Sequence, residues 1–337
     1  MKKLFAQLLS TSLATTPDSV DPVQGDQVPP LASEQKATER RAPVWARFAP
    51  FLLSGLFFYS VIFAVFSPIP LLMLFLKGGF GPLFLAVLTN SVLVTVLGGF
   101  PALSLYLVFV AALGVSLPFW AYSRRQKPDR TILLTFFTMA LTAVAILCGY
   151  SWSRGLSPVS EAHRLITQTV DFMVKVSTSQ NPSSLGDIPI DELKKGMVAE
   201  FPSLLGVFAL LMSWINFVMF FRMNPLRMRE SLGIEFSYFK TWKASEWLVW
   251  PTIVCGALLL FSKGAPYVTA LNLLKFSLVV YGLQGVSILA FVFDYLKVRG
   301  MVRTLLYVVT TFFMTPFLIG LGFFDLWFDF RSKLRQS

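Results

Sequence analysis

The sequence predicts an all-α fold, a polytopic transmembrane helical bundle with eight or nine spans. The 337 residues are 55% hydrophobic and 14% charged, with a mean hydropathy of +0.65, whereas soluble domains are about 25% charged. Apolar runs near the roughly 20 residues that cross a bilayer recur along the chain. Lys and Arg, which give the net charge of +11, cluster between these runs. This positive-inside pattern predicts a multi-pass membrane protein in contact with lipid.

Composition also excludes several classes of function. No polar domain is long enough to carry the basic face that nucleic acid binding requires. Cys148, Cys255 and the single histidine, His163, are too few for a disulfide framework or a metal site. The glycines of residues 78–81 lack the Lys-Ser/Thr of a phosphate-binding loop. We expect no enzyme activity, cofactor, metal or nucleic acid partner.

Residues 1–46 are predicted to be a disordered cytoplasmic tail, and residues 47–337 a transmembrane helical domain. Residues 15–41 are rich in Pro, Asp, Gln, Ser and Thr and show no apolar periodicity. Residues 1–14 have a basic start and a weak apolar stretch, so a short interfacial helix is favoured over a cleaved signal peptide. Basic residues just before the first span place the amino end in the cytoplasm.

The predicted spans are short and broken near the amino end. They are Phe48–Phe66, Pro68–Lys77 as a crossing or re-entrant segment, Leu83–Leu97, Ala102–Tyr122, Thr131–Tyr150, Phe201–Phe221, Trp250–Phe261, Tyr267–Val298 and Leu305–Phe324. Gly/Pro breaks at 67–70, 78–82 and 98–101 fit discontinuous helices that line a substrate site, or tight hairpins.

Two connectors separate the later spans. Residues 151–200 are nearly neutral and are predicted to form an extracytoplasmic amphipathic connector, a lid or a solvated link, with a short helix at Asp187–Glu200. Residues 222–246 are predicted to form a cytoplasmic basic loop. Nine crossings leave Arg331 outside, against the charge rule, so the side of the carboxyl end stays open.

The long apolar run Tyr267–Val298 carries most of the polar residues at membrane depth. Asn272 and Lys275 share a helical face, and Gln284 follows two to three turns later on roughly the same side. Because polar residues in spans usually face a bundle interior, these three are predicted to bind a polar, anionic ligand. The alternative is that Lys275 extends to the membrane surface.

A charged cluster follows the last span. Asp325 and Asp329 are spaced to share one helical face, and Arg331 is placed to compensate them. We interpret these residues as a structural ion cluster that anchors the last helix, with an ion-coupling site as the alternative.

The carboxyl-terminal half resembles a known family. The sequence W-x4-W-x2-W-P at 242–251, Ala-Leu-Asn-Leu-Leu at 270–274, Tyr-Gly-Leu-Gln-Gly at 281–285 and Leu-Gly-x2-Asp-x3-Asp-Phe-Arg at 321–331 resemble the YybS-like family of predicted bacterial membrane proteins, a domain of unknown function. The Pro-Ile-Pro break followed by Lys-Gly-Gly-Phe-Gly-Pro at 77–82 is loosely similar to the S components of energy-coupling-factor transporters.

Two functions follow as hypotheses. A small-solute binding or transport subunit in the bacterial cytoplasmic (inner) membrane is favoured by the polar residues of 267–298. The likeness to S components implies an ATPase-driven module as its partner, since this chain has no nucleotide site. The alternative is a non-enzymatic membrane scaffold that recruits a cytoplasmic or cell-envelope partner through the loop 222–246 or the tail.

Overall fold

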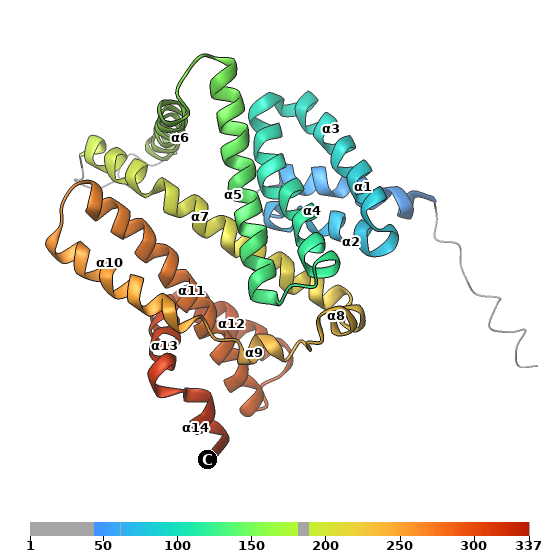
Figure 1. Ribbon diagram of the computed structural model, residues 1–337, viewed down its shortest axis with the longest axis vertical. Coiled ribbons are helices and arrows are strands. Elements are labelled where there is room, and N and C mark those ends of the chain that lie inside the picture. Colours follow the sequence, from blue (N-terminus) through green and yellow to red (C-terminus); the bar gives the residue numbers. More distant parts are fainter. Residues whose placement is uncertain (1–43, 61, 181–188, 337) are drawn as a thin grey trace, which may run out of the picture. The chain divides into compact units, whose positions relative to one another are not determined.

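The computed structural model describes residues 44–60, 62–180 and 189–336, and in these ranges the chain is helical, with no strand (Figure 1). Contacts divide the chain into residues 1–43 and residues 44–337, and all structure described below belongs to the second unit. The predicted tail lies outside the described residues, apart from 44–46 at the start of α1. Residues 181–188 of the predicted connector lie outside them as well.

The amino-terminal elements are short and interrupted. They are α1 (Val44–Tyr59), η1 (Ala64–Phe66), α2 (Ile69–Gly78), α3 (Phe80–Tyr106), η2 (Leu107–Ala111), α4 (Ala112–Pro118) and η3 (Phe119–Ser123). Gly79 separates α2 from α3 with φ 73°, and Gly99 interrupts the helical backbone inside α3 with φ 67° and ψ −164°. Glycine adopts this region without the steric penalty of a Cβ atom. The two breaks coincide with the Gly/Pro sites that the sequence indicates.

Three long helices follow. They are α5 (Pro128–Ser153), α6 (Pro158–Gln180) and α7 (Ile190–Met223). α6 packs against α5 and α7 and buries Val170 and Val174. The prediction of a helix ending at Glu200 and a separate span from Phe201 is wrong, because α7 continues through Pro202 as one helix of 34 residues.

The carboxyl-terminal part centres on one long helix. Its elements are α8 (Pro225–Leu232), α9 (Tyr238–Thr241), η5 (Glu246–Leu248), α10 (Val249–Phe261), α11 (Ala265–Tyr295), α12 (Gly300–Phe313), α13 (Thr315–Phe328) and α14 (Phe330–Gln336). α11 packs against α7, α10 and α13. α12 and α13 meet at an angle of 93°, because the helix ends before Pro316, which cannot donate a backbone hydrogen bond.

The predicted count of eight or nine spans is not supported. In the described residues, four helical segments are long and apolar enough to cross a membrane, or five if α12 and α13 form one broken span. The four are residues 80–123, 128–153, 190–223 and 265–295. The apolar runs at 50–59, 64–78 and 246–261 form shorter helices, below the roughly 20 residues that a straight crossing needs.

A Phe- and Leu-rich core fills the space between the helices. Its buried members come mostly from α2, α4, α5 and α7, with single residues from α3, η3 and α9, and include Leu72, Phe75, Leu113, Phe217 and Phe220. Packing of such side chains holds membrane helices together through van der Waals contact, since lipid is as apolar as the core. The polar residues of α11 lie outside this cluster.

We name one end of the bundle the basic end, where α5 begins and where α7 and α11 end. Contacts with residues 238–242 define it: Asp129 accepts hydrogen bonds from Tyr238 and Trp242, and Lys240 pairs with Asp294. Exposed cations in the described segments of this end include Arg124, Arg125, Lys127, Arg130, Arg222, Arg229, Lys243, Lys297 and Arg299.

The bent pair α12–α13 begins and ends at the basic end. Arg303, in α12, lies 2.5 Å from Asp294, and Arg331, just after α13, donates to the Trp242 carbonyl at 2.9 Å. We therefore regard α12–α13 as a re-entrant pair, because a segment that returns to its starting side does not cross. Arg331, near the carboxyl end, thus lies beside residues 240 and 242, and the membrane side that this end faces stays a prediction.

Candidate functional site

A buried ion pair links the end of α13 to α14. Arg331 Nη2 lies 2.6 Å from Asp325 Oδ2, and the two side chains are only 5% and 0% exposed. Arg331 Nη1 also donates to the backbone carbonyls of Trp242 at 2.9 Å and Lys240 at 3.2 Å. Asp325 Oδ1 accepts a hydrogen bond from the Phe330 amide at 3.0 Å. These added bonds offset the desolvation of two buried charges, which a bare pair does not repay.

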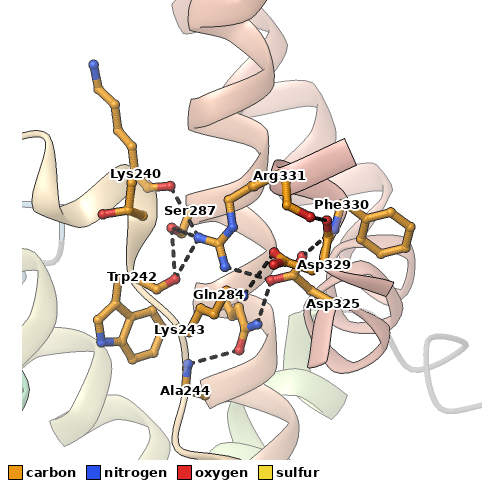
Figure 2. Close-up of polar contacts among 12 residues, drawn as sticks. Lys240, Trp242, Lys243, Ala244, Gln284, Ser287, Asp325, Asp329, Phe330 and Arg331 are labelled. Atoms are coloured by element: carbon orange, nitrogen blue, oxygen red, sulfur yellow. Dashed lines mark hydrogen bonds and ion pairs between the residues drawn. The ribbon is translucent and has the colours of Figure 1, made fainter. Parts of the chain in front are cut away.

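Figure 2 shows how α11 joins this pair to segment 238–244. Gln284 accepts a hydrogen bond from the Ala244 amide through Oε1 and donates to Asp325 Oδ2 through Nε2, both at 3.0 Å. Ser287, almost one turn further along α11, donates to the Phe239 carbonyl at 2.7 Å. Backbone groups of segment 238–244 that no regular helix satisfies thus find buried side-chain partners.

Asp129 holds the same segment from α5. Its carboxylate accepts hydrogen bonds from the Tyr238 hydroxyl at 2.8 and 2.9 Å and from Trp242 Nε1 at 2.8 Å. Burial, together with the neighbouring carboxylate, raises the pKa of the Tyr238 hydroxyl, because both disfavour the tyrosinate. Segment 238–244 is therefore anchored by α5, α11 and α14 at once.

Asp329 does not share the face predicted for it. α13 ends at Phe328, and Asp329 follows with φ 40°, a left-handed conformation that Asp adopts more readily than most residues. Its carboxylate lies 2.9 Å from Lys243 Nζ, with side chains 45% and 43% exposed. The Lys243 ammonium lowers the pKa of Asp329. The cluster predicted from spacing is thus a buried pair beside an exposed one.

Asn272 forms hydrogen bonds with backbone groups of α7 on both sides of Pro202. Asn272 Oδ1 accepts a hydrogen bond from the Ser203 amide at 2.8 Å, and Nδ2 donates to the Ala199 carbonyl at 2.9 Å. In an uninterrupted helix these two backbone groups bond each other. Pro202 lies between them and disturbs that pattern. The Asn272 amide therefore bridges the place where α7 passes through a residue that usually breaks helices.

Lys275 lies one turn further along α11, close to the same stretch of α7. Its Nζ is 2.6 Å from a carboxylate oxygen of Glu200, and the two side chains are 34% and 47% exposed. An ion pair with this exposure is screened by solvent and contributes little stability. The charge of Lys275 is thus compensated by Glu200 at the end of the bundle opposite the basic end.

The structure does not bring the three predicted ligand residues together. Gln284 is twelve positions after Asn272 in the sequence, or roughly 18 Å along a helix. Asn272 and Lys275 contact α7, whereas Gln284 contacts Ala244 and Asp325. Their common role in ligand binding stays a prediction.

A close helix crossing positions Gln284 against Asp325. A Cβ atom on Gly285 would lie 2.0 Å from the Leu318 carbonyl oxygen, and one on Gly322 would lie 1.9 Å from the Tyr281 carbonyl oxygen. Only glycine permits this approach of α11 and α13. A Cβ atom on Gly320, two residues earlier in α13, would meet nothing within 4 Å.

A groove lies beside this network, and sequence reasoning missed it. It has a volume of about 480 Å³ and is formed by α7, α9, α11, α12 and the segment before α9. Three of its lining side chains are cationic, Arg222, Lys240 and Arg303, and two are hydroxylic, Ser287 and Tyr307. The other lining residues are Trp214, Val218, Phe236, Phe239, Leu283, Val286 and Ala290. We name this feature the basic groove.

The site has no signature of metal chemistry. In the part of the chain that the structure describes, no group of three or more His, Cys, Asp or Glu side chains is arranged to hold a metal ion.

Asp129 and Ser287 are the residues of the network that sequence reasoning missed. The one available signal was that Asp129 is the only acid within the basic run 124–130.

Comparison with known proteins identifies a family. A family model described as "Predicted membrane protein (DUF2232)" matches residues 49–326, which include Asp129, Gln284 and Asp325 of the network but not Arg331. No curated protein and no solved structure matches the chain. The YybS-like name and the likeness to S components stay resemblances. The chain belongs to this DUF2232 family of predicted membrane proteins.

Proposed function

We propose that the protein is a non-enzymatic membrane scaffold that recruits a soluble partner at its basic end. The observation that supports this best is the anchoring of segment 238–244 by Asp129, Gln284 and Arg331. A surface whose backbone is already fixed loses less conformational entropy when a partner binds. The buried polar groups would then serve to hold a docking surface in shape.

The surface offered to a partner includes α8, which precedes this anchored segment in the chain and packs against α7 and η3. Leu226 in α8 is 73% exposed, and Arg229 is exposed three residues later. A large apolar side chain next to a cation suits a protein partner with an acidic face. The positive-inside rule directs the basic end to the cytoplasm, and we place the protein in the bacterial inner membrane.

A small-solute binding or transport subunit resembling S components is the second candidate. The observation in its favour is the pair of backbone breaks at Gly79 and Gly99, because discontinuous helices often line transport sites. A ligand at Asn272, Lys275 or Gln284 would have to displace protein partners that these side chains already hold. This candidate requires an ATPase-driven module as a partner.

Chemical crosslinking in native membranes, followed by purification and mass spectrometry, tests the scaffold proposal. A soluble protein should crosslink to the wild type, and its yield should fall at least about tenfold in the Leu226→Ser/Arg229→Ser variant. Arg154→Ser, which removes an exposed cation from the opposite end, should leave the yield unchanged. Absence of any crosslinked protein, or full retention in the α8 variant, would overturn the proposal. Recovery of an ATPase whose yield is insensitive to α8 would favour the transport subunit.

A further inference from the structure

We infer that the basic groove binds one anionic phospholipid, with its phosphate among Arg222, Lys240 and Arg303. This inference does not depend on the scaffold proposal. It rests on the combination of charge, apolar lining and position of the groove, which together match a charged headgroup attached to a hydrocarbon chain. Basic pockets between helices on the cytoplasmic side of membrane proteins are known to accept anionic headgroups.

The charges of the groove are only partly compensated. Lys240 and Arg303 share a single carboxylate, that of Asp294. Arg222 is in no ion pair among the described residues; its guanidinium lies 4.5 Å from the centre of the Phe236 ring, and its side chain is exposed. Only two of the three cations of the groove are therefore paired, both with the same carboxylate, and a phosphate monoanion would reduce this excess of positive charge.

The hydrogen-bonding groups of the groove also suit a phosphate. Arg303 Nη2 donates to the Ala290 carbonyl and to the Tyr307 hydroxyl, both at 3.2 Å, so the guanidinium is held in a fixed orientation beside Asp294. A guanidinium that is already oriented binds phosphate oxygens with less loss of side-chain entropy. Tyr307 keeps a hydroxyl at the same edge of the groove.

The apolar lining favours a lipid over a soluble anion. Val218 belongs to α7, and Leu283, Val286 and Ala290 belong to α11, which are both candidate membrane spans. An acyl chain beside these residues would stay at membrane depth while its phosphate reached the cations of the basic end. A free phosphate would leave this lining without an apolar partner. The volume of about 480 Å³ is in the range of ligand sites, which run from about 300 to 1,000 Å³.

Native mass spectrometry of the delipidated full chain in detergent tests this inference. The probes are phosphatidylglycerol, phosphatidylcholine with the same acyl chains, and free glycerol phosphate. We expect one phosphatidylglycerol to bind more tightly than phosphatidylcholine. Arg222→Gln should weaken phosphatidylglycerol binding roughly fivefold, and Arg222→Gln/Arg303→Gln should weaken it further. Val286→Phe, which fills the groove without changing its charge, should weaken binding of phosphatidylglycerol as well.

The matched control is Arg154→Gln. The Arg154 guanidinium lies 4.7 Å from the centre of the Tyr150 ring. It resembles Arg222, which lies 4.5 Å from the centre of the Phe236 ring, but it is at the opposite end of the bundle. This variant should bind phosphatidylglycerol as the wild type does. Equal loss in Arg154→Gln and Arg222→Gln would overturn the inference, as would equal binding of the two phospholipids by the wild type. Full competition by free glycerol phosphate would show that the groove takes a soluble anion, which also overturns it. Only variants whose thermal unfolding midpoint equals that of the wild type are compared, so that lost binding is distinguished from lost folding.

Discussion

The two halves of α11 place polar residues in opposite kinds of environment. Near its start, a neutral amide, Asn272, is held between helices, while the charge of Lys275 stays in an exposed ion pair. Near its end, Gln284 and Ser287 contact a network whose ion pair, Arg331 with Asp325, is almost fully buried. One helix thus supports a partly exposed ion pair at one end and a buried pair at the other.

The difference teaches what a buried charge requires in this fold. Arg331 and Asp325 are buried where backbone carbonyls, a backbone amide and Gln284 supply additional hydrogen bonds. Lys275 and Glu200 pair with each other without such a shell among the described residues, and they remain partly exposed. Burial of an ion pair is stable only with such bonds, because its Coulomb attraction alone does not offset desolvation.

Breaking the buried pair should give the largest effect. Asp325→Ala or Arg331→Ala leaves one buried charge uncompensated and should lower the free energy of unfolding by about 3–5 kcal/mol. Asp325→Leu/Arg331→Met removes both charges and should cost much less. Unfolding in detergent micelles measures these values. The control is the exposed pair, for which Lys243→Ala should change stability by at most about 1 kcal/mol. Equal losses at the two pairs would contradict the comparison.

A substitution that pushes α11 and α13 apart should destabilise the basic end alone. Gly322→Ala places a Cβ atom against the Tyr281 carbonyl and should destabilise by roughly 1–3 kcal/mol. Gly320→Ala on the same helix meets nothing within 4 Å and should be neutral or slightly stabilising. In Gly322→Ala, the rate of backbone amide hydrogen exchange should rise at residues 238–244 and stay unchanged at Ala199–Ser203. An equal rise at both places would show that the two ends are coupled.

Substitutions near the start of α11, at the end opposite the basic end, should have smaller effects on stability. Asn272→Ala leaves the Ser203 amide and the Ala199 carbonyl without their side-chain partner and should cost about 1–2 kcal/mol. Lys275→Ala removes only a partly exposed pair and should cost at most about 1 kcal/mol. The free energies of unfolding of the two variants decide this order. A larger loss for Lys275→Ala would indicate a role that its contact with Glu200 does not explain.

The sequence predicted the class of fold and the principal helix well. High hydropathy and clustered cations are sufficient for an all-helical membrane protein, and the predicted helix Tyr267–Val298 compares with α11 at Ala265–Tyr295. The predicted number of spans is not supported: the runs 83–97 and 102–122 fall in one helical segment, 80–123, and the runs near 50–59, 64–78 and 246–261 form short helices. Hydropathy alone does not give the length of the helix that an apolar run forms.

The partners of the polar residues were not predictable. Asn272 bonds backbone groups 69 and 73 positions away, and no local pattern marks a carbonyl that needs a donor. Two other Asn side chains form similar bonds. Asn90 donates to the carbonyl of Phe51, beside Pro50, at 2.6 Å. Asn216 donates to the carbonyl of Val65, near Pro68, at 2.9 Å. Among the described residues, these Asn side chains thus bond backbone carbonyls near proline. Where Asn and Pro occur together in apolar runs, this structural role is an alternative to ligand binding.

Hydrogen–deuterium exchange at segment 238–244, in the protein reconstituted in lipid, tests the central claim most directly. If α5, α11 and α14 hold this segment, its amides exchange slowly in the wild type, and Gln284→Ala speeds exchange at Ala244, whose amide loses its acceptor. Exchange at the rate of an unstructured peptide in the wild type, or no change at Ala244 in the variant, would contradict the account.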